Sequence, residues 1–297
     1  MYLVVGATGA VGHAVALELS KRGERVRALT RRSDDDAKVA ALRAAGVEIA
    51  PGDLKDASSV AAACRGARVV VSTASATVSR GSGDSIDTVD RLGQMALVDA
   101  AREAGVQRFV FVSFSGNIEL DFPLRHSKRQ VEARVRGSGM EYTILRPSMF
   151  MEVWLSPAVG FDAAAGRARI YGSGRNAISW ISLRDVVRYT VAAALGHEAA
   201  RNAVVELGGP RPVPPLDVVR TFEQATGRTF EVEHVPEEAL RAQLETATDP
   251  IQKTFAGLML AYAEGDVIPM DDTARRFGIS PMSVEEFARE SVPSTTQ

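Results

Sequence analysis

The sequence predicts an α/β protein with a doubly wound parallel sheet and a smaller C-terminal α+β domain, on three observations. A short apolar run at residues 2–5 leads into three evenly spaced glycines that open a segment with helical spacing. Strand-like apolar runs then alternate with helical segments as far as Pro147, which is the pattern of right-handed βαβ units. Beyond residue 150 the alternation stops, and glycines and prolines interrupt the chain.

The first loop, Gly6-Ala7-Thr8-Gly9-Ala10-Val11-Gly12, has the order strand, tight turn, helix. Glycines allow the backbone to turn sharply and to approach a ligand closely, and the new helix directs free N–H groups and its positive dipole end at an anion. The spacing Gly-x-x-Gly-x-x-Gly differs from the dehydrogenase fingerprint Gly-x-Gly-x-x-Gly. We expect this loop to bind the pyrophosphate of a dinucleotide, and a plain strand–turn–helix connection is the alternative.

Six apolar runs predict the strands of the sheet. They are residues 2–5, 25–29, 47–49, 69–71, 109–112 and 142–145. The β-branched run at 69–71 is typical of a strand that is covered on both faces. A long helix ends at Gly105, and a helical period gives it an inner stripe. That stripe consists of Val89, Leu92, Ala96, Leu97, Ala100 and Ala101.

The elements expected after residue 150 are less regular. They are a strand at 178–181, a helix at 185–195, a strand at 203–207, a helix at 216–225, a strand at 230–235 and helices within 236–265. We expect a dinucleotide-binding domain of residues 1–150 plus about 178–207. Residues 151–177 plus 208–297 would then form the smaller substrate-binding region.

Composition excludes several classes of function. The chain of 297 residues carries a formal net charge of −2 with acidic and basic residues mixed, which argues against a nucleic-acid footprint. The single cysteine, Cys64, excludes internal disulfides and a thiolate metal site, and the 4 histidines lack metal-ligand spacing. No apolar run approaches the roughly 20 residues of a membrane span. We expect a cytoplasmic monomer or homodimer with a small-molecule substrate and no metal, membrane or nucleic-acid partner.

Several short motifs follow one another in a fixed order over residues 1–150. They are Gly6-Ala7-Thr8-Gly9-Ala10-Val11-Gly12, Leu29-Thr30-Arg31-Arg32, Gly52-Asp53-Leu54, Ala100-Ala101-Arg102-Glu103-Ala104-Gly105-Val106, Phe109-Val110-Phe111-Val112-Ser113, Lys128-x-x-x-Glu132 and Tyr142-Thr143-Ile144-Leu145-Arg146-Pro147. Together they resemble the atypical short-chain dehydrogenase/reductases, in particular the NmrA-like and isoflavone-reductase-like group. The resemblance is looser beyond Pro147. It implies a Rossmann-type domain that binds NAD(P) and a small C-terminal substrate domain.

The end of the second strand indicates which dinucleotide is bound. An NAD site needs a carboxylate about 20 residues past the glycines for the ribose 2′-hydroxyl, whereas an NADP site places an arginine near the 2′-phosphate. This position holds Thr30, Arg31 and Arg32, and the nearest acids are Asp34 to Asp36. Because a guanidinium binds phosphate through a fork of N–H groups, we expect NADP(H) as the cofactor. A solvated basic turn is the alternative.

Cofactor contacts are expected in three further places. These are Asp53 and Leu54 beside the adenine, the small residues Thr73, Ala74 and Ser75 after the fourth strand, and Pro147, Ser148, Met149 and Phe150, which the resemblance places along the nicotinamide. Ordinary turns, a plain loop and packing between domains are the alternatives for these three sets.

Lys128 is the first candidate for a catalytic residue. The Tyr-x-x-x-Lys pair of typical short-chain dehydrogenases is absent, since Leu124 stands four residues before Lys128. Lys128 lies fourteen residues before Tyr142, where isoflavone-reductase-like enzymes carry their lysine. The resemblance implies contact with the cofactor, where burial would lower the pKa of this lysine for proton transfer, or where it would only hold ribose hydroxyls. An exposed helix lysine is the alternative.

Ser113, just past the fifth strand, is the second candidate, as a hydrogen-bonding partner of substrate or nicotinamide; turn formation is its alternative. The resulting expectation is an NADPH-dependent oxidoreductase that reduces a small apolar, conjugated or aromatic acceptor by hydride transfer. The missing tyrosine keeps open an NmrA-like regulatory or assembly protein that binds NADP without turnover. An NADP-dependent isomerase or epimerase is a third hypothesis.

Overall fold

The computed structural model of the protein describes residues 1–31, 36–77 and 81–291, which form two compact units. Unit 1 consists of Met1–Phe114, Pro123–Arg146 and Val186–Val205. Unit 2 consists of Ser115–Phe122, Pro147–Asp185 and Glu206–Gln297. The division of cofactor and substrate binding between two domains stays a prediction.

A seven-stranded sheet organises unit 1, in the order β3-β2-β1-β4-β5-β6-β9. Its strands are β1 (Tyr2–Val5), β2 (Val26–Thr30), β3 (Glu48–Pro51), β4 (Val69–Ser72), β5 (Arg108–Val112), β6 (Glu141–Pro147) and β9 (Ala203–Leu207). The registers from β3 through to β6 are parallel. The strand order reverses between β1 and β4, which is the place where ligands bind in sheets of this kind. The doubly wound parallel sheet predicted from the sequence is confirmed.

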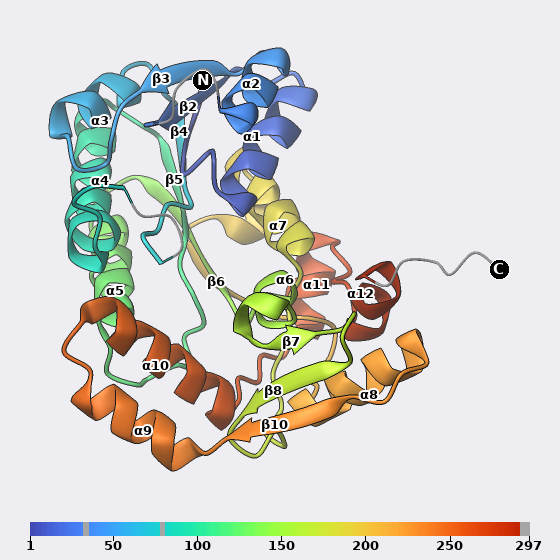
Figure 1. The fold of residues 1–297 in the computed structure, drawn as a ribbon. Helices are drawn as coiled ribbons and strands as arrows, with labels where there is room; N and C mark the ends of the chain where they lie inside the picture. The colour runs from blue at the N-terminus through green and yellow to red at the C-terminus, as the bar shows by residue number, and fades with distance from the viewer. Residues whose placement is uncertain (32–35, 78–80, 292–297) are drawn as a thin grey trace. The chain divides into compact units, whose positions relative to one another are not determined.

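Helices cover both faces of this sheet (Figure 1). They are α1 (Ala10–Lys21), α2 (Ala37–Ala44), α3 (Ala57–Cys64), the π-helical segment η1 (Ile86–Gly93), α4 (Gln94–Glu103), α5 (Pro123–Arg136) and α7 (Leu183–Leu195), with a short 3₁₀ turn η3 (Glu198–Ala200) before β9. Figure 1 shows α3, α4 and α5 on one face and α1, α2 and α7 on the other. Because the strands from β3 to β6 are parallel, the connections from strand to helix lie at one edge of the sheet, which is formed by the carboxyl ends of the strands.

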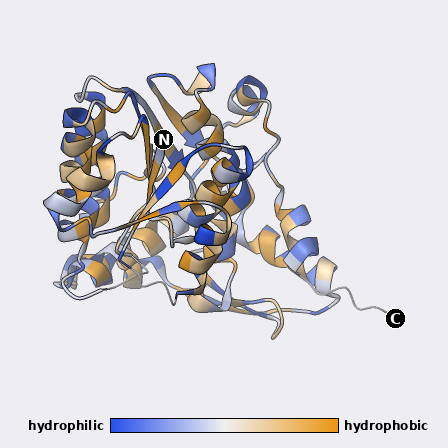
Figure 2. Ribbon diagram, turned by 90° about the horizontal axis from the view of Figure 1, so that it is seen from above, coloured by the Kyte–Doolittle hydropathy of each residue, from blue (hydrophilic) through white to orange (hydrophobic). Residues whose placement is uncertain are grey.

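The core of unit 1 lies between the sheet and these helices. Val69, Val70 and Val71 of β4 are all 0% exposed, as the β-branched run predicts for a strand covered on both faces. Phe109 and Phe111 of β5 are also fully buried and give the core much of its volume. Figure 2 shows hydrophobic residues along the strands, and helices that carry both hydrophobic and hydrophilic residues.

The segment η1 departs from the helical period assumed for residues 89–101. Its hydrogen bonds run from residue i to i+5, so the face turned inward shifts relative to an α-helix. Leu92, expected in the inner stripe, is 49% exposed, whereas Asp90 and Gln94 are fully buried. The stripe is therefore wrong at Leu92, and two polar side chains occupy the inner face.

Unit 2 contains a three-stranded sheet in the order β10-β8-β7 and several helices, of which α10 has 15 residues. Its elements are α6 (Met151–Trp154), the 3₁₀ turn η2 (Pro157–Val159), β7 (Phe161–Asp162), β8 (Arg167–Tyr171), α8 (Pro215–Thr226), β10 (Glu231–Val235), α9 (Glu237–Thr246), α10 (Pro250–Glu264), α11 (Asp271–Phe277) and α12 (Val284–Ser291). The strand expected at 178–181 is wrong. Ile178 and Ile181 form only isolated bridges, because each pairs with a different segment rather than with one continuous neighbour.

An aromatic cluster forms the core of unit 2. Tyr262 of α10 lies 5.3 Å from Tyr171, 5.4 Å from Trp154 and 5.6 Å from Trp180, measured between ring centroids. Two of these contacts are edge-to-face, an arrangement that aromatic rings favour. Within the described part of the chain, no helix combines the length and apolar character needed to cross a membrane.

Candidate functional site

The glycine loop joins β1 to α1 by a tight turn. Gly6 has a φ of +88°, a left-handed conformation that favours glycine, and its carbonyl accepts a hydrogen bond of 2.9 Å from the N–H of Gly9. Helix α1 then begins at Ala10. Gly9 and Ala10 are exposed, and among the described residues no side chain caps this end of the helix. The first-turn N–H groups of α1 are therefore open to an anion.

The three positions of the loop favour glycine for different physical reasons. A Cβ atom on Gly12 would lie 2.3 Å from the carbonyl oxygen of Gly6 and 2.5 Å from Oγ1 of Thr73. A Cβ atom on Gly6 would lie 2.7 Å from the same Oγ1. On Gly9 the nearest atom would be the Gly6 oxygen, at 3.2 Å. The protein's own packing therefore requires Gly6 and Gly12, whereas Gly9 faces outward and leaves space above the loop.

The loop after β4 packs against the glycine loop. The N–H of Thr73 donates to the carbonyl of Val5 at 2.9 Å, which continues the strand pairing by one residue. Gln94 accepts from the hydroxyl of Ser72 and donates to the carbonyl of Ala74, at 2.7 and 2.9 Å. Thr73, Ala74 and Ser75 are half-buried and border the carboxyl edge, as expected from the sequence.

A network of two cations and two carboxylates lies at the ends of β2 and β3. Nη1 of Arg31 is 2.7 Å from both carboxylate oxygens of Asp84 and 3.7 Å from Asp53. Lys55 pairs with Asp53 at 3.0 Å and also with Asp84. Burial alone would raise the pKa of Asp84, but hydrogen bonds from Arg31 and Lys55 hold it at about 2. Asp84 therefore stays ionised and keeps Arg31 beside the end of β2.

This network changes the interpretation of the second strand's end. Arg31 is paired, so it is not the free guanidinium that the motif alone implies, while Arg32 lies outside the described residues. Leu54 is 7% exposed and belongs to the hydrophobic core, so only Asp53 of the Asp53–Leu54 pair presents a substantial surface.

Sequence reasoning missed three charged residues in this region. Asp84 and Lys55 complete the network, and Nζ of Lys38 donates to the carbonyl of Thr8 in the glycine loop at 2.9 Å. The sequence carries no local signal for these contacts. Asp84 is 53 residues from Arg31, and the two meet only because of the strand order.

Lys128 is buried on the inner face of α5. Its side chain is 6% exposed, so the exposed-lysine alternative is wrong. Nζ lies 3.4 Å from the carbonyl of Val112, 3.7 Å from Oδ1 of Asp90 and 4.9 Å from the centre of the Phe111 ring. Burial lowers the pKa of Lys128, against the opposing attraction of Asp90. A buried ammonium group with these long contacts can release a proton more readily than a surface lysine.

Ser113 points into a separate cluster of buried charges. Its hydroxyl donates to Oε1 of Glu132 at 2.6 Å. Glu132 is 0% exposed and also pairs with Arg129 at 2.5 Å and with Arg146. The hydroxyl proton of Ser113 is therefore committed to Glu132, and Ser113 can serve a ligand only as an acceptor in this arrangement.

The residues expected along the nicotinamide belong to unit 2. Ser148 donates to Oδ2 of the buried Asp266 at 2.6 Å, and Ser115 donates to its Oδ1 at 2.8 Å. Met149 is 4% exposed, and its carbonyl accepts from the N–H of Ile181 at 3.0 Å. Pro147 is buried and Phe150 half-buried. The role of Pro147, Ser148, Met149 and Phe150 toward a cofactor stays a prediction.

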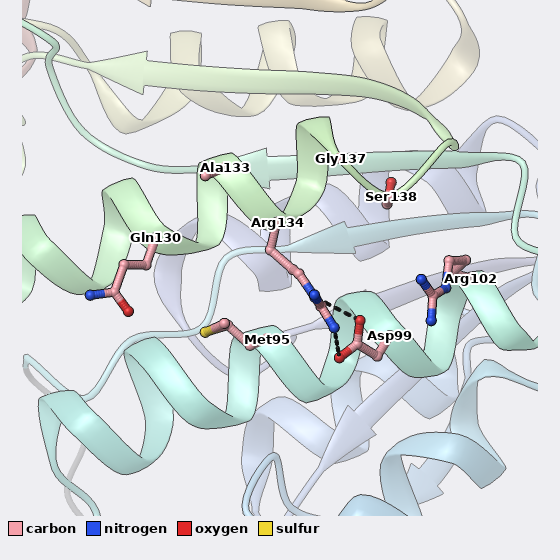
Figure 3. A pocket seen from close by; sticks show the side chains of 8 residues that line it. All are labelled: Met95, Asp99, Arg102, Gln130, Ala133, Arg134, Gly137 and Ser138. Carbon is pink, nitrogen blue, oxygen red and sulfur yellow. Dashed lines mark hydrogen bonds and ion pairs between the residues drawn. The ribbon is translucent and has the colours of Figure 1, made fainter.

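A surface hollow of about 370 Å³ lies between α4 and α5, where Asp99 and Arg134 pair across it at 2.7 Å (Figure 3). None of the residues predicted for the site lines this hollow. Among the described residues, no group of three or more His, Cys, Asp or Glu side chains is placed to hold a metal ion. The chemistry-bearing residues of unit 1 gather instead at the carboxyl ends of β1, β2, β4 and β5.

Comparison with known proteins finds relatives along nearly the whole chain. The model of the NmrA-like family matches residues 2–288. The chain is 31% identical to an isoflavone reductase homolog of Zea mays, over 89% of this chain and 86% of that protein. It is 27% identical to the photosystem II assembly factor Ycf39 of Trieres chinensis, over 79% of this chain and 72% of the factor.

Solved structures share the fold at lower sequence identity. An NADPH-dependent quinone oxidoreductase of Escherichia coli, complexed with NADPH, superposes with a TM-score of 0.78 at 19% identity. The superposition covers 98% of this chain and 99% of the other.

The glycine geometry leads to a first prediction. Gly12→Ala should destabilise the protein by about 1–3 kcal/mol, the usual cost of overpacking, because its Cβ meets backbone and Thr73 atoms that cannot both move away. Gly9→Ala is the matched control and should cost less than half as much, since its Cβ has a single near neighbour. Urea unfolding of the two variants measures the difference. Equal losses would contradict the assignment of Gly12 to packing and of Gly9 to an open face.

Proposed function

The chain belongs to the NmrA-like family, as the order of its sequence motifs predicts, and we propose that it is an NADPH-dependent oxidoreductase. Its substrate would be a small apolar acceptor, conjugated or aromatic. One observation carries the proposal: the buried Lys128 lies at the end of β5, on the same edge of the sheet as the glycine loop. This edge is where open α/β sheets bind their ligands.

The residues at this edge fit a dinucleotide phosphate. The open face of Gly9 and the uncapped start of α1 suit a pyrophosphate. Thr73, Ala74 and Ser75 are half-buried, and their small side chains leave room for a ligand to pass over the ends of the strands. Among the described residues, Arg31 uses only Nη1 to bond Asp84, so its remaining N–H donors suit a 2′-phosphate.

Bound NADPH supplies the hydride for such a reduction. The chain's own part is to orient the acceptor, exclude water and provide the proton. Nζ of Lys128 is the candidate donor, because burial eases proton release; the neutral amine left behind takes up a proton again before the next turnover. Ser113 would assist only as an acceptor of a hydrogen bond from the ligand.

A second candidate function is an NADP-binding assembly or regulatory protein without turnover. Two observations favour it. The buried Leu124 occupies the position of the missing tyrosine, and one relative is a photosystem II assembly factor. The buried Lys128 favours the reductase. A buried ammonium that is incompletely hydrogen-bonded lowers the stability of the fold, and a catalytic role would explain why it is present.

The cofactor preference gives the second prediction. NADPH should bind more tightly than NADH, and Arg31→Ala should weaken NADPH binding at least tenfold, since a lost charge-assisted hydrogen bond costs about 1.5–3 kcal/mol. NADH affinity should change little. Calorimetry of both cofactors measures this, with Arg22→Ala as the control because Arg22 forms an exposed ion pair with Glu18 on α1. Equal affinity of the unaltered protein for both cofactors would rule out the 2′-phosphate site.

The third prediction separates the two candidate functions. NADPH absorbance is followed with a panel of quinones, azo dyes and conjugated ketones. Lys128→Ala should lower turnover by roughly 10²–10⁴-fold while NADPH affinity stays nearly unchanged, as for loss of a general acid. If Lys128 only holds the ribose, affinity falls together with turnover. Consumption of NADPH by no acceptor would support the assembly protein instead.

Lys128→Arg provides the matched control for charge. Arginine keeps the positive charge but does not give up its proton. Turnover near that of the unaltered protein in Lys128→Arg would therefore leave Lys128 an electrostatic role only.

A further inference from the structure

Asp90 is a buried carboxylate with one oxygen left without a hydrogen bond. The residue lies on η1 and is 0% exposed. Oδ2 accepts the N–H of Ala76, in the loop after β4, at 2.9 Å. Oδ1 has no hydrogen-bond partner among the described residues. An unpaired buried oxygen is costly, and a charged one more so, which means that its place in the fold needs a reason.

The nearest charge to this oxygen is the ammonium of Lys128. Nζ lies 3.7 Å from Oδ1, which is an ion pair but longer than the roughly 2.7–2.9 Å of a charge-assisted hydrogen bond. Within the described part of the chain, Nζ has one hydrogen bond, to Val112, which is also long at 3.4 Å. Two buried opposite charges therefore face each other while both keep hydrogen-bonding capacity.

Of the described carboxylates that affect Lys128, Asp90 is the less fully hydrogen-bonded. The charged groups that affect it are Asp90 on η1 and Glu132 and Arg129 on α5, while β5 contributes the Phe111 ring. Glu132 is already bonded to Arg129 and Arg146, so its charge is largely balanced. The electrostatic environment of the ammonium is therefore set mainly by burial and by Asp90.

The π-helical turn explains how Asp90 reaches this place. A regular α-helix through residues 89–101 would turn Leu92 inward, whereas η1 buries Asp90 and exposes Leu92. Wide turns of this kind occur mostly as single turns and often at functional sites. With one oxygen on Ala76 and the other toward Lys128, Asp90 connects the loop after β4 to the ammonium.

From this geometry we propose that Asp90 is a positioning residue, whose carboxylate fixes the Lys128 ammonium at the carboxyl edge and keeps it charged until it donates its proton. The proposal rests on the reductase function proposed above. The competing explanation is that Asp90 only anchors the loop through the N–H of Ala76. The two explanations differ in what happens when the charge is removed but the acceptor oxygen is kept.

Asp90→Asn makes that change, because the asparagine carbonyl can still accept from Ala76. Loss of an opposite charge at this distance should lower the pKa of Lys128 by at least 1 unit, within the range of about 1–3 units for such neighbours. The pKa is measured by NMR titration of protein labelled with ¹³C at the lysine ε carbons. The chain has five lysines, and the signal lost in Lys128→Arg assigns Lys128.

The control is Asp87→Asn, on the same turn of η1, where Asp87 forms an exposed ion pair with Arg91. It should leave the pKa of Lys128 unchanged. An equal pKa in Asp90→Asn and the unaltered protein would overturn the proposal. This titration needs no substrate. It therefore tests whether Asp90 acts on the charge of Lys128 even if no acceptor is reduced and the proposed function fails.

The pH profile of kcat/KM gives the matching kinetic result. The ammonium form of Lys128 is the active one, so activity should fall as the pH rises through its pKa. In Asp90→Asn this alkaline limb should move to lower pH by as much as the pKa of Lys128 falls in the NMR titration, while NADPH affinity is unchanged. Asp90→Glu should return the limb at least part of the way toward its original pH. A lower kcat with an unmoved limb would indicate a structural role only and would overturn the proposal.

A double variant covers the case in which Asp90→Asn does not fold. Asp90→Asn/Lys128→Met removes both charges of the pair. Recovery of a cooperative unfolding transition in the double variant would support the pairing, since no buried charge is then left alone. A double variant that folds no better than Asp90→Asn alone would show that the two charges do not balance each other, and would overturn the proposal.

Discussion

The close approach of three backbone segments at the carboxyl edge is the constraint on which the rest of unit 1 depends. Gly12 lies so near the carbonyl of Gly6 and the side chain of Thr73 that a single added carbon would not fit. This contact holds the start of α1 between the ends of β1 and β4, where the strand order reverses. The same contact leaves Gly9 and the first N–H groups of α1 facing outward. Packing and anion binding are therefore two consequences of one arrangement of glycines.

The buried charges next to this edge fall into two kinds. Glu132 is bonded to Ser113, Arg129 and Arg146, so its cluster is satisfied and joins β5, β6 and α5. The Asp90–Lys128 pair is different, because in the part of the chain that the structure describes both members remain incompletely hydrogen-bonded. Buried polar groups that a fold leaves incompletely bonded are costly, and they tend to persist where chemistry uses them. This contrast is the physical basis for proposing Lys128, rather than Ser113, as the proton donor.

Much of the fold was predictable from the sequence, because apolar runs and glycines report local structure. The strands of the sheet and the glycine loop follow from such patterns, whereas Lys128 was singled out through the family resemblance and its spacing to Tyr142. The pairing of Arg31 with Asp84 was not predictable, since it depends on strand order across 53 residues. Nor was the burial of Asp90, because a π-helical turn changes the period that places Leu92. In unit 2 residues 178–181 resemble a strand in sequence, but Ile178 and Ile181 form isolated bridges to different segments instead of pairing with one continuous strand.

The central claim is that the chain transfers a hydride from NADPH and a proton from Lys128 to a small acceptor. The most direct measurement is isotope transfer from NADPH deuterated at the reactive C4 position of its nicotinamide, with the product analysed by mass spectrometry. With a conjugated ketone as acceptor, the account predicts one deuterium on carbon in the reduced product, retained in ordinary water, whereas a label delivered to quinone or azo acceptors exchanges with solvent as O–D or N–D. Binding of NADPH with no oxidation of the cofactor by any quinone, azo dye or conjugated ketone would contradict it.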